Sequence, residues 1–352
     1  MNPKSGGAER TIDEIGKRLV SYGHEVHLFS VNWKGGPNES IYNGVKIHRV
    51  PGNIYSHLLH RKILRRYKDA NVIIDDLGHV VPYASERLIN IPGVALFRHL
   101  HARTLVGQVN RFEGAVLKLL EKEYGWFYPR WRFITESETP AKDLEKLGIG
   151  RDRITVILPG VDHEKFVPSN ERIPGQLIYF AGMRRYKRAD HAILAFKKIS
   201  GSYDLNLIMV GNGPCYDNLR KLTNDLGISN RVIFTGKLND LDLARTISKS
   251  YVNIHSSIEE GWCYSPLEAA ASGVPTAAYY NEGMSDEIIN GVTGSFAKDG
   301  DPDALALSII NVLENFKEYS RNAYEFSKRF SWDSSAKKWE YFLIHVSESN
   351  IN

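Results

Sequence analysis

Short apolar runs bounded by turn residues alternate with helix-like patterns along most of the chain. This alternation is typical of parallel sheets with helices on both faces, because a strand buried on both sides reads as a continuous apolar run. The sequence therefore predicts the α/β class. The expected strands are EVHLFSV, VKIHRV, NVIIDD, GVALFRH, RFITES and ITVILPG in the first half, and QLIYFAG, LNLIMVG, RVIFTG, VNIHSS and PTAAYY in the second. The expected helices of the first half cover residues 8–22, 58–69, 82–90, 110–124 and 139–147.

The chain is too long for a single ordinary core. A length of 352 residues favours two domains, each built on a Rossmann-like sheet. Three prolines, two glycines and mixed charges indicate a linker over residues 159–176. We expect an N-terminal domain over residues 1–167 and a C-terminal domain over residues 168–352. With 42% hydrophobic and 24% charged residues, the composition excludes a disordered chain.

The two cysteines and the apolar runs bear on where the protein works. Cys215 and Cys263 form no disulfide framework and no Cys-x-x-Cys metal pair, which indicates a reducing compartment. No apolar run approaches the roughly 18 residues that a membrane span requires, and the opening MNPKSGGAER lacks the apolar stretch of a signal peptide. We therefore expect a cytoplasmic protein that is neither inserted nor exported.

Positive charge is concentrated in the first half. Residues 1–170 contain 25 Lys and Arg against 19 Asp and Glu, a net +6, whereas residues 171–352 contain 20 against 22, a net −2. The blocks RKILRRYK (61–68) and YPRWRF (128–133) suit either contact with anionic lipid headgroups or an anionic acceptor, or solvated helix faces. No zinc-ligand, RNA-recognition or helix-turn-helix signature accompanies this charge, so we do not expect a nucleic acid partner.

The beginning of the chain departs from the doubly wound pattern. Such a domain opens with a strand that leads into a glycine-rich turn and a helix, yet the turn SGG at residues 5–7 has only four residues before it. The first strand is apparently missing. Loss of an innermost strand would leave its neighbours with unpaired backbone groups. A late start or a truncation therefore explains the missing strand better than a sheet that tolerates the loss.

Two glutamates stand eight positions apart in SSIEEGWCYSPLEAAASG (256–273). Glu268 fits a capping box in which Ser265 is the N-cap and Pro266 the first helical residue, so it has a purely structural interpretation. Glu260 could be an ordinary acidic residue of a surface loop. However, both follow the predicted strand VNIHSS, at the carboxyl edge where open α/β sheets bind ligands. The start of the next helix offers free amides there, which suits a phosphate-containing, hydroxyl-rich ligand.

The segment EEGWCYSPLEAAASGVP resembles the Glu-x7-Glu segment of the retaining GT-B glycosyltransferases of family four. The resemblance extends over the chain. NPKSGGAERTIDEIGKRLVSYGHEV resembles the family's N-terminal glycine turn and first helix. VGNGP (210–214) and NRVIFTGKL (230–238) resemble turns of its second domain, and NGVTGSF (290–296) resembles the segment after its last catalytic helix.

The resemblance implies roles for several residues. Glu260 would contact the donor sugar, and Glu268 would hold the ribose diol, for which a carboxylate is a bidentate acceptor. Lys187 in GMRRYKR (182–188) matches the lysine of the family's diphosphate clamp. Met183 stands where the clamp arginine is expected, so Arg184 takes that role ahead of Arg185. The second-domain turns would bring two further donor-binding residues, which are Gly213 and Lys237.

In the first half, the resemblance implies that Gly7, beside Gly6, contributes to the donor diphosphate site at the start of the first helix. It also implies a histidine near the donor sugar at the end of strand GVALFRH, for which His99 and His101 both qualify. Alternation places these two side chains on one face of the strand. We interpret His24 and His255 as structural.

Two further segments resemble known motifs. The Asp-x-Asp pattern at residues 240–242 imitates a metal motif, but it stands at a predicted helix start and is better explained by capping. We expect no metal site, since cations and helix ends can balance the phosphate charge. The segment around Trp332 resembles the terminal helix that crosses back to the N-terminal domain.

The resemblance implies a metal-independent, retaining hexosyltransferase with no cofactor besides its nucleotide-diphosphate sugar donor. The donor would bind mainly to the C-terminal domain, across a cleft from the acceptor. We expect this acceptor to be a lipid-linked glycan on the cytoplasmic face of an anionic membrane. No enzyme nucleophile is required if the leaving diphosphate accepts the proton of the acceptor. Two alternatives stay open: a catalytically silent nucleotide-sugar-binding subunit, and a phosphorylase or synthase acting on a soluble sugar.

Overall fold

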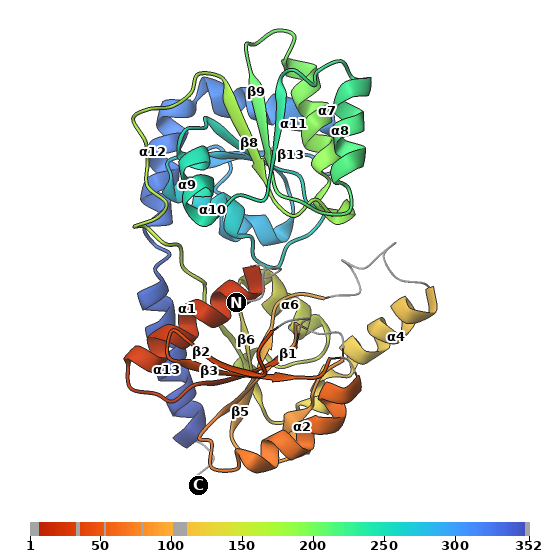
Figure 1. Ribbon diagram of the computed structural model, residues 1–352, viewed down its shortest axis with the longest axis vertical. Coiled ribbons are helices and arrows are strands. Elements are labelled where there is room, and N and C mark those ends of the chain that lie inside the picture. Colours follow the sequence, from red (N-terminus) through yellow and green to blue (C-terminus); the bar gives the residue numbers. More distant parts are fainter. Residues whose placement is uncertain (1–6, 33–35, 53, 79–80, 101–110, 349–352) are drawn as a thin grey trace. The chain divides into compact units, whose positions relative to one another are not determined.

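A computed structural model describes residues 7–32, 36–52, 54–78, 81–100 and 111–348. The chain forms two compact units (Figure 1). The N-terminal unit comprises residues 1–160 together with 332–352, and the C-terminal unit comprises residues 161–331. The units thus divide after residue 160, whereas the boundary expected from the sequence is after residue 167.

The N-terminal unit contains two sheets. Three strands lie in the order β1-β3-β2, with β1 parallel and β2 antiparallel to β3, and four parallel strands lie in the order β4-β5-β6-β7. The strands are β1 (His27–Val31), β2 (Glu39–Tyr42), β3 (Val45–Val50), β4 (Ile73–Asp76), β5 (Gly93–Phe97), β6 (Arg132–Thr135) and β7 (Ile154–Val156). The helices are α1 (Gly7–Ser21), α2 (Ile54–Arg66), α4 (Arg111–Lys122), α5 (Tyr124–Phe127), α6 (Glu138–Lys146) and α13 (Trp332–Glu348).

In the described residues no strand precedes α1, and β1 and β4 are edge strands of separate sheets. In a doubly wound sheet, the strand that leads into the first helix lies between the strands that correspond to these two. Only one residue of β4, Asp75, is buried and none of β1 is, whereas every residue of β5 is buried.

The terminal helix α13 belongs to the N-terminal unit, as the sequence predicted. It packs against α1, whose apolar residues Ile15 and Leu19 are buried one turn apart. Arg18 Nε donates to Asp333 Oδ1 at 2.6 Å, and His24 Nε2 lies 2.9 Å from Glu340 Oε1. These contacts agree with a structural role for His24.

The helix expected over residues 82–90 is wrong. Only the single 3-10 turn Ser85–Arg87 forms there, after Ala84 in a left-handed conformation with φ 53°. Ser85 donates through N and Oγ to the carboxylate of Asp75, and the Glu86 carboxylate accepts from the backbone N of Trp131 at 3.0 Å. Ser85 and Glu86 are therefore held by hydrogen bonds to distant residues instead of continuing a helix.

The C-terminal unit has one parallel sheet of six strands in the order β10-β9-β8-β11-β12-β13. The strands are β8 (Gln176–Phe180), β9 (Asn206–Val210), β10 (Val232–Gly236), β11 (Val252–His255), β12 (Thr276–Tyr279) and β13 (Gly294–Ala297). The helices are α7 (Ala189–Ile199), α8 (Tyr216–Asp225), α9 (Asp240–Ser248), α10 (Tyr264–Ala271), α11 (Pro302–Glu314) and α12 (Phe316–Ser327). Apolar clusters fill both faces of this sheet, which explains the uninterrupted apolar runs.

The strand order reverses between β8 and β11. The chain proceeds from β8 outward to β10 on one side, and from β11 outward to β13 on the other. Open α/β sheets bind ligands at the carboxyl ends of the strands that flank such a switch point. The segments that follow β8 and β11 are therefore where a ligand site is expected.

Candidate functional site

A lysine and a glutamate meet at this switch point. The Lys187 ammonium, from the turn after β8, donates to Glu260 Oε1, from the loop after β11. The two side chains are only 14% and 10% exposed. His255, the last residue of β11, lies beside them with Nε2 3.4 Å from the same carboxylate oxygen. Lys187 and Glu260 were both predicted from the sequence to be donor-site residues. The structure brings them together although they are 73 positions apart in the chain.

Backbone hydrogen bonds hold the two loops together. Ile258 N donates to Tyr186 O at 2.9 Å, and Ser256 Oγ donates to Arg188 O at 2.7 Å. The Glu260 backbone is also confined by Gly283, because a Cβ at Gly283 would lie 1.9 Å from Glu260 O. The loop that carries Glu260 is thus held by hydrogen bonds to the turn that carries Lys187 and by close packing against Gly283.

Charge is retained at this site despite burial. Burial opposes ionisation of both groups, but their mutual attraction raises the pKa of Lys187 and lowers the pKa of Glu260. Burial would also lower the pKa of His255, yet Cys263 and Glu260 raise it to about 9. The site therefore presents a paired ammonium and carboxylate at neutral pH, with a protonated His255 ring beside them.

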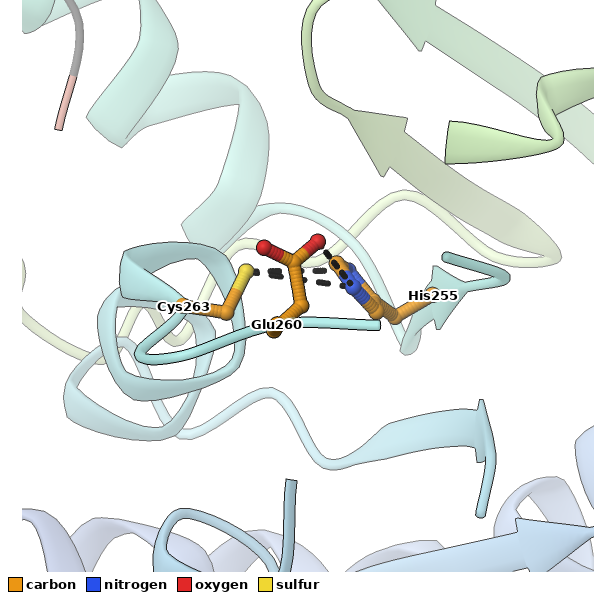
Figure 2. A group of neighbouring side chains, drawn as sticks. All are labelled: His255, Glu260 and Cys263. Atoms are coloured by element: carbon orange, nitrogen blue, oxygen red, sulfur yellow. Dashed lines mark hydrogen bonds and ion pairs between the residues drawn. The ribbon is translucent and has the colours of Figure 1, made fainter. Parts of the chain in front are cut away.

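Cys263 and His255 also lie at this site, although the sequence did not predict a role for either of them there. Cys263 Sγ lies 3.8 Å from His255 Nε2 (Figure 2). Ser265 Oγ lies 3.2 Å from His255 Nδ1. Burial raises the pKa of the Cys263 thiol, but the positive charge of the adjacent protonated His255 more than offsets this, and the pKa is lowered. His255 was assigned a structural role, although its place at a strand end before the glutamate loop was a usable signal.

The capping-box interpretation of Glu268 is wrong. Helix α10 begins at Tyr264 rather than at Pro266, and its N-cap Cys263 makes no side-chain capping bond. Ser265 therefore lies inside the helix, where its hydroxyl faces His255. Glu268 is the fifth residue of α10 and is buried. Its proposed contact with ribose stays a prediction.

The other predicted donor residues lie on turns at the same sheet edge. Gly213, with φ 158°, packs against the turn after β8, since a Cβ would lie 2.5 Å from Met183 O. Lys237 is exposed and follows β10, the outer strand of the sheet. Arg184 and Arg185 are exposed, unlike Lys187. Gly213 thus has a structural reason to be glycine, in addition to any role toward the donor.

The remaining predicted residues belong to the N-terminal unit. Gly7 begins α1, and His99 follows β5 and is half-buried. His101 lies outside the described residues.

The carboxyl edge of the four-stranded sheet in the N-terminal unit carries a buried arginine that the sequence did not single out. Arg98 binds Glu136 at 2.8 Å and Asp76 at 3.1 Å, which joins the ends of three adjacent strands.

The Asp-x-Asp pattern is part of a helix start, as expected. Asn239 is the N-cap of α9 and accepts from the backbone N of Asp242 at 2.9 Å, while Asp240 and Asp242 occupy the first turn.

No helix in the described part of the chain combines the length and apolar character that crossing a membrane would require.

Two family models match the chain in succession. The one described as Glycosyltransferase Family 4 matches residues 5–165, and the one described as Glycosyl transferases group 1 matches residues 163–329. The N-acetyl-alpha-D-glucosaminyl L-malate synthase of Bacillus anthracis is 26% identical, over 91% of this chain and 87% of that protein.

Solved structures share the fold. Sucrose-phosphate synthase from Thermosynechococcus elongatus superposes with a TM-score of 0.82 at 18% identity, covering 97% of this chain and 94% of that one. HepE from Anabaena, solved in complex with UDP-glucose, superposes with a TM-score of 0.78 at 17% identity, covering 98% of each chain. The predicted GT-B fold is confirmed. Because the two family models together span residues 5–329, the chain belongs to the glycosyltransferases, with a family 4 N-terminal half and a group 1 C-terminal half.

Proposed function

We propose that this glycosyltransferase is a retaining enzyme in which Lys187 holds the diphosphate of a nucleotide sugar and Glu260 contacts the donor sugar. Glycosyltransferases of this group take the sugar from a nucleotide-sugar donor. The base and the ribose would be held on the C-terminal unit, with Glu268 accepting from the ribose hydroxyls. Gly213, Lys237 and Arg184 would complete the diphosphate site from the neighbouring turns.

The observation that carries this proposal is the buried Lys187–Glu260 pair at the switch point of the sheet. A buried ammonium next to the leaving group would stabilise the charge that develops on the diphosphate as the glycosidic bond breaks. Glu260 keeps that ammonium charged, since the carboxylate raises the pKa of Lys187. A cation supplied by the chain supports transfer without a required metal ion.

Retention of configuration follows if the leaving diphosphate accepts the acceptor's proton on the face from which it departs. The protein then supplies position and charge rather than a nucleophile. In the N-terminal unit, Gly7, His99 and His101 remain the residues proposed to contact the donor.

Transfer is tested with a panel of uridine, guanosine and adenosine diphosphate sugars, with release of nucleoside diphosphate as the readout. We expect Glu260→Gln to bind donor, measured by thermal shift, and to lose at least about 100-fold in transfer, the size of effect seen for one electrostatic contact in a transition state. Glu259→Gln, the adjacent acid, is the matched control. Equal activity in the Glu260 and Glu259 variants would refute the assignment. Donor binding without transfer in the wild-type protein would favour a catalytically silent subunit.

We further propose a lipid-linked acceptor on an anionic, cytoplasmic membrane face. Helix α4 exposes Phe112 (78%), Leu119 (61%) and Val116 (40%) at helical spacing, and Trp126 is 60% exposed just beyond it. An exposed apolar stripe with lysines beside it suits a headgroup surface. Both cysteines are free, as a cytoplasmic location would require.

Flotation with anionic liposomes at low salt tests this acceptor proposal. We expect the wild-type protein to float and a Phe112→Ser, Leu119→Ser variant to remain at the bottom. Leu307→Ser, another exposed leucine, is the control because it lies on the other unit. Equal flotation of all three proteins, or none of the wild type, would contradict the proposal.

A further inference from the structure

Three side chains with metal-ligating atoms converge beside the Lys187–Glu260 pair. His255 ends β11, Glu260 belongs to the loop that follows, and Cys263 caps α10 (Figure 2). One ligand atom from each residue lies within 4.8 Å of the others. Because a single short connection carries all three residues, the cluster is rigidly positioned by one strand end and one helix start.

The spacing of these atoms is close to, and somewhat wider than, the spacing of ligand atoms around a tetrahedral zinc ion. With Zn–S near 2.3 Å and Zn–N or Zn–O near 2.1 Å, neighbouring ligand atoms are separated by roughly 3.4–3.6 Å. His255 Nε2 lies 3.4 Å from Glu260 Oε1 and 3.8 Å from Cys263 Sγ. Small side-chain adjustments would therefore complete three bonds, and the fourth position would belong to water.

A hydrogen-bonding neighbour orients the His255 ring for metal binding. Ser265 Oγ lies 3.2 Å from His255 Nδ1, which leaves Nε2 to face Glu260 Oε1 at 3.4 Å. Cys263 Sγ lies beside the ring, 3.8 Å from Nε2 and 3.9 Å from Nδ1. A hydrogen bond to the second ring nitrogen is the usual support of a metal-bound histidine. Glu287 fixes the backbone at Cys263, since its Oε1 accepts from Cys263 N at 2.6 Å. A thiolate and a carboxylate would together balance the charge of a divalent ion.

We propose that His255 Nε2, the Glu260 carboxylate and Cys263 Sγ form a reversible Zn²⁺ site. Binding releases the thiol proton and any proton on the imidazole to solvent. Glu260 then ligates the metal instead of pairing with Lys187, so Zn²⁺ opposes transfer; this consequence, unlike the binding itself, rests on the proposed function. The nearby ammonium repels the ion, which limits affinity and makes the site regulatory rather than structural.

Cobalt(II) titration of the full-length protein, under a non-thiol reductant, tests binding without any activity measurement. We expect one equivalent of Co²⁺ to produce the near-ultraviolet thiolate charge-transfer band and the intense visible bands of a tetrahedral site, and Zn²⁺ to abolish both. Cys215→Ser should keep the charge-transfer band and Cys263→Ser should lose it. His255→Gln should weaken binding at least tenfold, and Lys187→Met should strengthen it.

Wild-type protein that gives only weak octahedral cobalt absorption would overturn the proposal, as would a charge-transfer band that survives Cys263→Ser or disappears in Cys215→Ser. In the transfer assay, we expect Zn²⁺ to inhibit the wild type and to inhibit Cys263→Ser at least tenfold less. If no donor supports transfer, the proposed function fails, while the cobalt spectrum still decides the metal site.

Discussion

Removing the ammonium of Lys187 should destabilise the C-terminal unit strongly. Lys187→Met keeps the length of the side chain but leaves the Glu260 carboxylate, only 10% exposed, without its principal counter-charge. Loss of one partner of a buried pair costs about 3–5 kcal/mol in unfolding free energy. His255, 3.4 Å from Glu260, retains part of the compensation. We therefore expect a loss near the lower end, about 3 kcal/mol.

Urea denaturation followed by circular dichroism measures this loss, and a double-mutant cycle isolates the pair. Glu260→Gln alone leaves an unpaired buried ammonium, whereas the double variant leaves two neutral groups. The double variant should therefore lose less than the sum of the single losses, with a coupling of about 1–3 kcal/mol. Lys198→Met is the control, because Lys198 pairs with Asp303 on the surface and should contribute less than about 1 kcal/mol.

Two results would refute the reasoning. The first is a Lys187→Met protein that unfolds at the same urea concentration as the Lys198→Met control. The second is additivity of the single losses within about 0.5 kcal/mol, which would mean that the two charges do not interact.

Three further predictions concern local structure. Gly283→Ala should weaken nucleoside diphosphate binding in calorimetry, because its Cβ would lie 1.9 Å from Glu260 O, whereas Gly201→Ala has nothing within 4 Å and should bind normally. Burial lowers the pKa of His60 below its ordinary 6.5, so the unfolded chain binds the proton more tightly. The unfolding free energy should therefore fall as pH decreases from 6.5, and the fall should be shallower in His60→Gln. Asn239→Ala removes the N-cap of α9 and should lower the unfolding free energy by about 1 kcal/mol, whereas an unchanged urea midpoint would deny the cap any weight.

Most of the fold could be read from local sequence, and the exceptions have physical causes. The buried strands of the two all-parallel sheets were predicted because both of their faces are apolar. Strand β13 was missed, since GSFA is short and follows a glycine-containing turn. Strand β2 was missed because it is an edge strand with mostly exposed residues. The false helix at 82–90 failed because Glu86 and Ser85 form hydrogen bonds with distant residues, which no local pattern reveals.

The sequence alone determined that Lys187 and Glu260 each follow a strand, because the alternation of apolar runs and turns is a local property. The sequence also placed Glu268 on a helix that follows the same strand as Glu260. Only the tertiary structure decided that β8 and β11 are neighbours, and therefore that the ammonium and the carboxylate touch. It alone brought His255 and Cys263 to the same carboxylate. Strand order depends on which crossovers bury the most apolar surface, and that is a property of the whole sheet rather than of any segment.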